Sequence, residues 1–383
     1  MSRSAPIRVR DIWRALDERY PFTHRAEWDN VGILLGDIDA PVRSVVVALD
    51  ATPAAIAACR RARAGLLVTH HPAIFTPLSS VRPGVPAESA AYELIRMGVA
   101  VISAHTNADA APRGVSHALA RRAGLQDIVP LIPGEPQGAC KVTVFTPPER
   151  ADDILAAVAS AGGARIGEYR DCSFRAAGTG SYRPSAAASP WRGRADRLAT
   201  VAEVRLETVV AKTLVPPVLR AVRSVHPYEE PAVDVVPLAN GALGGGIGVV
   251  GNRKRPAPLR EALDDLCARV RPSCARVAGP REKVIRRVAV VAGSGAEFVG
   301  AAREAGADLF VTGDVKYHQA LDAAAGDMPV VDIGHGSGEK WILPEFRKVI
   351  AGRFGGSLAV RVHLEEEPLR PYRPGAGAGG KRP

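Results

Sequence analysis

Short apolar runs alternate with helical patterns over much of this chain. Apolar residues recur at helical spacing from Val9 to Leu16 and predict an amphipathic helix that ends before Tyr20-Pro21. The apolar run 44–50 leads into Thr52-Pro53, which is typical of a helix start, and an alanine-rich helical segment follows. A further apolar run begins at Leu66. Strand, helix and strand in this order predict a βαβ unit and a mainly parallel sheet.

The alternation continues towards the C-terminus but changes character in the middle of the chain. Later apolar runs predict further strands at 99–103, 288–292, 309–312 and 329–333. The middle region predicts strands at 141–146, 202–207 and 232–236 and helices at 149–161 and 216–224. A long Gly/Ser/Pro-rich excursion occupies residues 176–195. This middle pattern favours a small ferredoxin-like α+β module.

Side chains that bind metal ions recur where the predicted buried strands end. Three pairs stand at such ends: His70 with His71, His105 with Asp109, and His335 with Glu339. Strand ends of one parallel sheet lie on a common rim, so these pairs are expected to converge. The resulting site would offer nitrogen and oxygen ligands without a thiolate. Such a site suits catalytic Zn, Mn, Fe or Co better than a closed structural zinc.

Each pair taken alone also has a structural interpretation: an incidental role for the two adjacent histidines, a polar strand-to-loop turn for His105 and Asp109, and a surface pair for the last. If His70 and His71 stay extended, their rings point to opposite sides and one ion cannot take both, whereas two neighbouring ions could if the chain turns there. His335 and Glu339 share one face only if a helix begins near His335, and the two intervening glycines weaken that premise. A carboxylate in this position could bridge two cations.

Three other motifs carry weaker signals. Gly246–Gly251 matches G-x-G-x-x-G, but no helix follows directly, so the motif is interpreted as a glycine-rich strand and not as a dinucleotide site. The loop Gly293–Gly295 could hold an anion or form an ordinary strand-to-helix turn. Lys316 and His318 could line a site or belong to a solvated turn.

Composition narrows the class of protein. The 383 residues are 46% hydrophobic, no run is long enough to span a membrane, and the charged N-terminal segment is unlike a signal sequence, so a cytoplasmic protein is expected. The five cysteines form no C-x-x-C pair, so the sequence indicates neither a zinc ribbon nor a disulfide framework. The net charge of +10 comes with no basic motif interleaved with aromatic residues, so no specific nucleic-acid partner is expected.

Several motifs in the same order resemble those of the GTP cyclohydrolase 1 type 2 family, also called Nif-three-like proteins. The matching segments are Trp28–Gly32, Thr69–Pro72, His105–Asn107 with Asp109, His226–Pro231, Thr312–Asp314 with His318, and Gly334-His335 with Glu339. The resemblance covers nearly the whole chain except the tail. Departures from the family pattern are Ala108, Ser116 and Gly336, where leucine, asparagine and an aromatic residue are common.

The resemblance implies a dinuclear metal centre in a toroidal hexamer, with a middle insert similar in fold to PII-type signalling proteins. Carried over by motif, His70, His71, Asp109 and His335 would be metal ligands and Glu339 would bridge the two ions. His105 would line the site. The cofactors would be two divalent ions, with Zn, Mn or Fe as candidates. His105 and His318 are candidates for the general acid or base.

Ligands from distant parts of the chain can meet only if the middle module is looped out. We therefore expect an α/β fold with a discontinuous main domain of mixed, parallel-rich sheets, residues 1–137 and 241–367. The inserted module would occupy residues 138–240, and the tail 368–383 would be disordered. The favoured function is a metal-dependent hydrolase of a nucleotide or a phosphorylated small molecule. The alternative is a non-catalytic metal-binding hexameric scaffold that acts through the insert.

Overall fold

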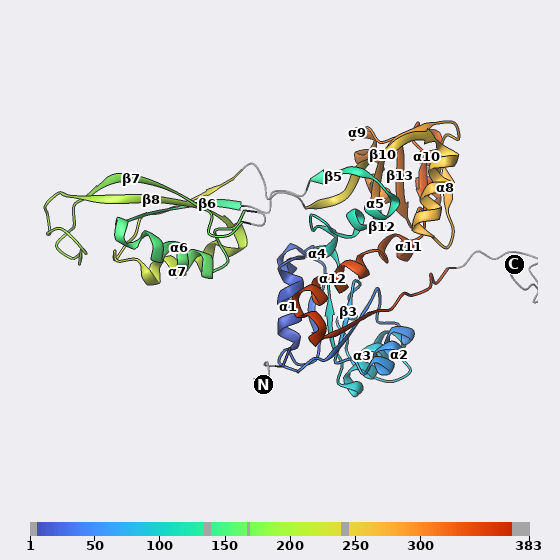
Figure 1. Cartoon of the computed structure of the whole chain (residues 1–383), viewed down its shortest axis with the longest axis horizontal. Coiled ribbons are helices and arrows are strands. Elements are labelled where there is room, and N and C mark those ends of the chain that lie inside the picture. The colour runs from blue at the N-terminus through green and yellow to red at the C-terminus, as the bar shows by residue number, and fades with distance from the viewer. Residues whose placement is uncertain (1–5, 134–138, 167–168, 239–244, 370–383) are drawn as a thin grey trace, which may run out of the picture. The chain divides into compact units, whose positions relative to one another are not determined.

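The computed structural model describes residues 6–133, 139–166, 169–238 and 245–369, and the chain divides into two compact units (Figure 1). The first unit combines the N-terminal and C-terminal parts of the chain, and the second consists of the middle part. The domain boundaries expected at 137/138 and 240/241 lie outside the described residues, as does the tail from residue 370 onward. In the described part of the chain, no helix is long and apolar enough to cross a membrane.

The first unit contains a five-stranded sheet in the order β1-β4-β3-β2-β15. Its strands are β1 (Gly32–Leu35), β2 (Ser44–Ala48), β3 (Leu66–Thr69), β4 (Ala100–Ser103) and β15 (Ala359–Val362). Strands β15, β2, β3 and β4 pair in parallel, in this order, and β1 pairs with β4 in the antiparallel direction. Four helices accompany this sheet: α1 (Val9–Asp17), α2 (Pro53–Ala62), α3 (Pro86–Met97) and α12 (Ile342–Phe354).

Alternate strand residues of this sheet enter two different cores. Val45 and Val47 of β2 pack with apolar residues of α1 and α12, while Val46 and Ala48 pack with those of α2 and α3. The sheet is thus covered on both faces, as the continuous apolar runs of its strands require. The predicted βαβ unit is confirmed, and Thr52 caps α2 by accepting a hydrogen bond from the backbone N–H of Ala55 at 3.1 Å.

A second sheet of the same unit has six strands in the order β11-β14-β13-β12-β10-β5. These are β5 (Gln126–Pro133), β10 (Gly246–Pro258), β11 (Arg276–Ala278), β12 (Val284–Ser294), β13 (Leu309–Gly313) and β14 (Val330–Asp332). The central strands β12, β13 and β14 are parallel, and the remaining pairs are antiparallel. The accompanying helices are α4 (Thr106–Asp109), α5 (Val115–Ala123), α8 (Leu259–Val270), α9 (Val299–Glu304), α10 (Tyr317–Ala325) and α11 (His335–Glu339).

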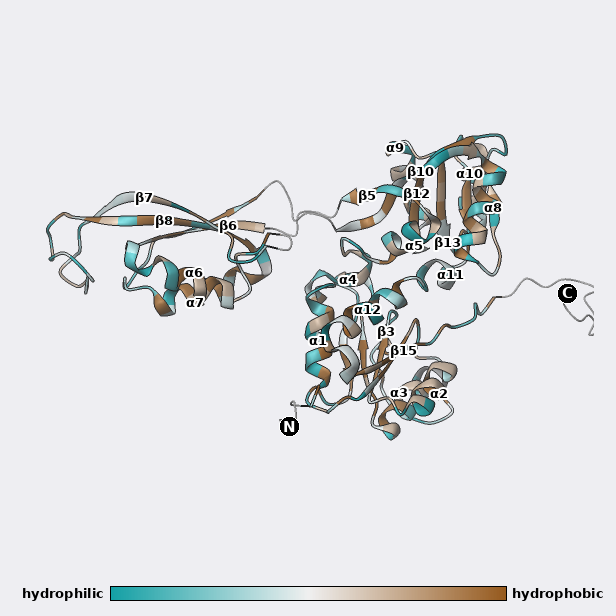
Figure 2. Ribbon diagram, in the orientation of Figure 1, coloured by the Kyte–Doolittle hydropathy of each residue, from teal (hydrophilic) through white to brown (hydrophobic). Residues whose placement is uncertain are grey.

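The second unit contains a four-stranded antiparallel sheet in the order β7-β8-β6-β9. Its elements follow the chain as β6 (Ala139–Thr146), α6 (Ala151–Ser160), β7 (Ser173–Tyr182), β8 (Ala199–Ala211), α7 (Val215–Val225) and β9 (Val233–Pro237). Apolar residues of both helices form one core with those of β6 and β8. The colouring of Figure 2 shows the brown apolar residues gathered on α6 and α7 and on the sheet that they cover.

The structure corrects the sequence predictions in two places and confirms the strand interpretation of one motif. Part of the Gly/Ser/Pro-rich excursion forms β7, which pairs with β8 from Ser173 to Tyr182, because a strand needs backbone partners more than apolar side chains. The Gly246–Gly251 motif lies inside β10, as the strand interpretation predicted. The metal-binding pairs do not follow strands of one sheet, because β3 and β4 belong to the first sheet and β14 to the second.

Candidate metal centre

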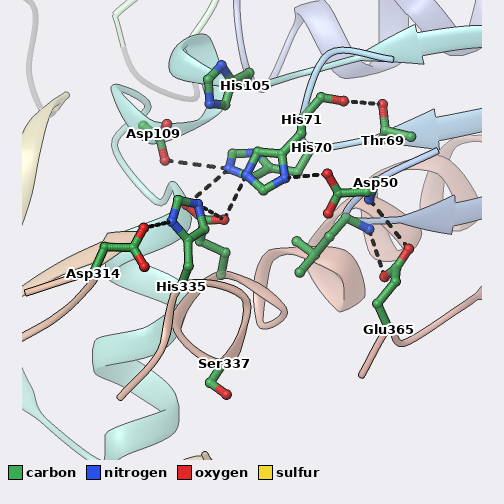
Figure 3. Close-up of polar contacts among 12 residues, drawn as sticks. Asp50, Thr69, His70, His71, His105, Asp109, Asp314, His335, Ser337 and Glu365 are labelled. Atoms are coloured by element: carbon green, nitrogen blue, oxygen red, sulfur yellow. Dashed lines mark hydrogen bonds and ion pairs between the residues drawn. The ribbon is translucent and has the colours of Figure 1, made fainter. Parts of the chain in front are cut away.

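Four histidines and a glutamate converge within the first unit, at the ends of β3, β4 and β14 (Figure 3). Ring centroids of His70 and His71 are 4.9 Å apart, and those of His71 and His335 are 5.3 Å apart. His105 completes the cluster, with its ring centroid 5.3 Å from that of His70. The two sheets therefore contribute to one site, although their strands do not pair with each other.

His70 is the most enclosed of these side chains, with no exposed surface. Its backbone N–H extends the pairing of β3 by donating to the carbonyl of Ala48 at 3.2 Å. Its ring Nδ1 lies 2.9 Å from the carbonyl oxygen of Ala104. Because a carbonyl can only accept, Nδ1 is the donor and the neutral ring keeps its lone pair on Nε2.

His71 and His335 are oriented in the same way by carboxylates. Nδ1 of His71 lies 2.9 Å from Oδ1 of Asp50, and Nδ1 of His335 lies 2.7 Å from Oδ2 of Asp314. Both rings thereby leave Nε2 for the centre of the cluster. A carboxylate behind a ligating imidazole fixes the tautomer and raises the basicity of the ring, as in many metal sites.

His105 is held by a more elaborate polar group. Its Nδ1 lies 2.9 Å from Oδ1 of Asp29, and Oδ2 of the same carboxylate accepts the backbone N–H of Thr106 at 3.0 Å and the hydroxyl at 2.5 Å. Burial alone would raise the pKa of Asp29, but the hydrogen bonds from His105 and Thr106 outweigh it and lower the pKa to about 2. Asp29 thus stays ionised behind the imidazole.

The carboxylate of Glu339 lies between the imidazoles and directs one oxygen to each side. Oε1 is 3.7 Å from Nε2 of His70, while Oε2 is 2.9 Å from Nε2 of His71 and 3.1 Å from Nε2 of His335. Helix α11 carries both His335 and Glu339 on one face, as four-residue spacing predicts. Gly293 makes space for this carboxylate, since a Cβ at position 293 would lie 2.2 Å from Oε1 of Glu339.

Asp109 approaches the cluster from α4. Its Oδ1 lies 3.9 Å from Nε2 of His70, and its side chain is 38% exposed, so it is the most accessible carboxylate among the predicted ligands. Desolvation raises the pKa of Asp109 and outweighs the opposing effect of the neighbouring His70, while Glu339 raises the pKa further.

The concentration of charge changes the protonation of the cluster. Burial lowers the pKa of His71, but hydrogen bonds to Asp50 and Glu339 outweigh it and raise the pKa to about 10. The hydrogen bond to Glu339 raises the pKa of His335 to about 9. Burial would raise the pKa of Glu339, yet the surrounding histidines hold it well below its usual value. Without a metal ion, protons on the imidazoles neutralise the buried carboxylate.

The cluster fits a metal ion on grounds of donor chemistry. Nε2 of His70 is buried and has no hydrogen-bond partner within the described residues, and the oxygens nearest to it are too distant for a hydrogen bond. A cation would satisfy this buried nitrogen. Two overlapping groups have ligand atoms within 4.8 Å of one another: His70, His71 and His105, and His71, His335 and Glu339. Mixed imidazole and carboxylate donors suit a divalent transition metal.

Other predicted residues lie elsewhere or are already engaged. His318 is exposed on α10, where its ring contacts Tyr317, and it belongs to neither metal-binding group. Lys316 is exposed beside it. The backbone N–H of Gly295, in the predicted anion loop, donates to the hydroxyl of Thr312 at 2.9 Å.

Sequence reasoning assigned no role to the carboxylates that orient the rings. Asp50 follows β2, and Asp314 follows β13 with a φ of 53°, a left-handed conformation that Asp tolerates better than most residues. Both stand at ends of parallel strands. A search for acidic residues at such positions, as well as for metal-binding pairs, could have found them.

Known proteins resemble this chain over nearly its whole length. Residues 7–368 match the family model Duf34/NIF3 (NGG1p interacting factor 3). The chain is 36% identical over 361 residues to a GTP cyclohydrolase 1 type 2 homolog of Mycobacterium tuberculosis, covering 93% of this chain and 94% of that one. A homolog of the same name from Bacillus subtilis is 33% identical over 329 residues, covering 86% and 88%.

Among solved structures, a Bacillus cereus protein related to NIF3 superimposes with a TM-score of 0.82 and 32% identity, covering 97% of this chain and all of that one. A Staphylococcus aureus protein superimposes with a TM-score of 0.77 and 27% identity over 97% of this chain. On the family match across nearly its whole length, the chain belongs to the Duf34/NIF3 family.

Proposed function

We propose that this chain binds two divalent metal ions through His70, His71, Asp109, His335 and Glu339 and hydrolyses a nucleotide or another phosphorylated small molecule. The observation that carries the proposal is the arrangement around Glu339, whose two oxygens face different imidazoles. A carboxylate placed in this way is suited to bridge two cations, with His70 and Asp109 on one side and His71 and His335 on the other. When bound, such cations make water acidic enough to attack near neutral pH and polarise the substrate.

Aromatic side chains beside the cluster support a substrate with a planar ring. Trp28 and Phe75 are 66% and 53% exposed, and their ring centroids are 6.0 Å apart. Trp28 also lies 6.1 Å from the ring of His105. Exposed aromatic rings next to a buried polar site offer a stacking surface, which favours a nucleobase over a simple sugar phosphate.

His105 is the better supported of the two predicted acid–base residues. Asp29 accepts from its Nδ1, so Nε2 is the atom that faces the other imidazoles and is able to accept or return a proton. This arrangement of carboxylate and imidazole resembles the base and its orienting partner in other hydrolases. His318, exposed on α10, has no such partner among the contacts of the described residues.

The test is metal analysis followed by turnover. Protein purified without chelators should contain up to two divalent ions per chain by mass spectrometry of the elements. Metal-replete protein should then hydrolyse at least one member of a panel of GTP, other nucleotides and phosphorylated metabolites. Glu339→Gln should abolish turnover, because the amide cannot serve as an anionic bridge, while the assembly stays intact in solution.

A metal-loaded protein that turns over nothing in the panel would favour the alternative, a non-catalytic scaffold that binds partners through the second unit. The β-α-β-β-α-β order of that unit supports a ferredoxin-like, PII-like module of the kind that such a role would use. In both proposals the protein is a hexamer, which light scattering would detect. A chain without bound metal after metal reconstitution would contradict both.

A further inference from the structure

The chain continues past β15 as an extended segment, residues 363–367, that runs beside the candidate metal centre. The backbone N–H of His363 donates to the carbonyl of Val47 at 2.8 Å, so the segment first follows β2. Beyond it, side chains alternate between half-buried and exposed, with Glu365 and Glu367 half-buried and Glu366 exposed. Residues two apart in an extended chain point to the same side, so Glu365 and Glu367 both face the first unit.

Glu365 binds the backbone that carries Asp50. Its Oε2 accepts the backbone N–H of Leu49 at 3.1 Å, and its Oε1 lies 3.4 Å from the N–H of Asp50 (Figure 3). Asp50 in turn orients the ring of His71. A partly buried pair of N–H groups beyond the end of β2 thus donates to a carboxylate more than three hundred positions away in sequence, which holds Asp50 in place.

Glu367 binds the other ligand segment. Its Oε1 accepts the backbone N–H of Ser337, within the first turn of α11. Donors at the start of a helix lack partners inside the helix, so this bond stabilises the short helix that carries His335 and Glu339. Gly334 makes the approach possible, since a Cβ at this position would stand 3.0 Å from the same carboxylate oxygen.

The two carboxylates therefore reach two of the three segments that build the cluster, and these two come from different sheets; His105 and Asp109 form the third segment. One holds the backbone of Asp50 behind His71, and the other holds the helix of His335 and Glu339. Neither carboxylate belongs to the metal-binding groups. Two charged side chains that satisfy backbone donors in both segments would not be needed for an apolar strand to pack.

We propose that Glu365 and Glu367 are positioning residues of the metal centre, and that the C-terminal segment sets the geometry and affinity of the site by holding the segments of His71 and of His335 and Glu339. The inference rests on the proposed metal centre. Removing an orienting partner outside the ligands typically weakens metal binding by about 10- to 100-fold. Because these carboxylates act through the backbone, we expect about a tenfold loss for each and a larger loss for both together.

The experiment uses Co²⁺, whose visible absorption reports the geometry of its ligands. The full chain and the variants Glu365→Ala, Glu367→Ala and the double variant are titrated with Co²⁺ against a chromophoric chelator. Glu365→Gln and Glu367→Gln keep one acceptor oxygen and the shape of the side chain, so they should recover part of the lost affinity. Glu304→Ala removes an exposed carboxylate on α9 and should bind like the unsubstituted chain.

Two readouts separate positioning from simple loss of stability. We expect weaker binding and a changed absorption spectrum at saturating Co²⁺, with the thermal unfolding of the metal-free variants close to that of the unsubstituted chain. Equal affinity and an identical spectrum in the double variant would overturn the inference and leave the metal centre standing. If the unsubstituted chain binds no Co²⁺, both the metal centre and this inference fail.

Discussion

Two of the three ligand segments of the cluster are built in opposite ways. His70 and His71 continue β3, and their backbone N–H groups donate to the carbonyls of Ala48 and Leu49 at the end of β2. His335 and Glu339 lie on α11, a helix of five residues that contains Gly336 and Gly338. The first segment is placed by a parallel sheet, whereas the second depends on side chains that bind its ends.

The histidine side chains of the two segments also differ in burial. The side chain of His70 is fully buried and that of His71 is 21% exposed, whereas that of His335 is 36% exposed. The backbone carbonyl of Ala104 anchors His70, and the exposed carboxylate of Asp314 anchors His335. The comparison teaches that His70 is part of the folded core, whereas His335 can be altered at little cost to the fold although Glu339 on the same helix is buried.

The largest expected difference between these two histidines is in stability. In metal-free protein, His70→Ala should lower the free energy of unfolding by roughly 2–4 kcal/mol, because it leaves a cavity and an unpaired carbonyl at Ala104. His335→Ala should cost about 1 kcal/mol or less, since the side chain is partly exposed. Both should lose metal binding. Denaturant unfolding and metal titration of the two variants measure the contrast.

The exposed histidine on α10 supplies the control, because His318→Ala should change neither stability nor metal binding. Equal destabilisation by His70→Ala and His335→Ala would contradict the contrast between the buried His70 and the partly exposed His335. Loss of metal binding in His318→Ala would show that His318 takes part in the metal site.

Much of this arrangement was readable from the sequence. Apolar runs that end in paired histidines, or in a histidine and a carboxylate four residues apart, predicted which side chains meet, because buried strands present their ends to a common region. The rings of His70 and His71 do not point to opposite sides, as those of a fully extended pair would, because both approach Glu339. The helix beginning at His335 formed despite its glycines.

What the sequence left out are contacts between distant segments. Glu365 meets the backbone of Asp50 because β15 pairs with β2, and β15 is a short strand of mixed polar and apolar residues that no pattern singles out. Gly293 looked like part of a loop, and only the fold shows that its missing side chain makes room for Glu339. Such features are set by tertiary packing, which local periodicity does not encode.

A smaller effect is expected when the orienting carboxylates are neutralised. Asp50→Asn and Asp314→Asn should each lower metal affinity by about tenfold, because an amide oxygen still accepts from the imidazole but no longer raises its basicity. Asn tolerates the left-handed conformation of Asp314, so the backbone should persist. Chelator competition measures both. Asp322→Asn, an exposed change on α10, is the matched control, and unchanged affinity in both test variants would exclude an orienting role.

The smallest expected effect is the release of protons when the metal binds. Both His71 and His335 have raised pKa values, about 10 and about 9, so in metal-free protein the protonated rings stabilise the fold at low pH and this contribution is lost as pH rises through that range. A metal ion needs neutral rings. At pH 8, metal binding should therefore release up to about two protons per chain, and the apparent affinity should rise with pH up to about 10.

Calorimetry in buffers of different ionisation enthalpy counts these protons. The His335→Asn variant should release about one proton fewer, because one of the two protonated rings is gone. Proton release near zero at pH 8 would mean that both rings are already neutral in the metal-free protein. The pKa values of His71 and His335 would then not be raised above that of an ordinary histidine.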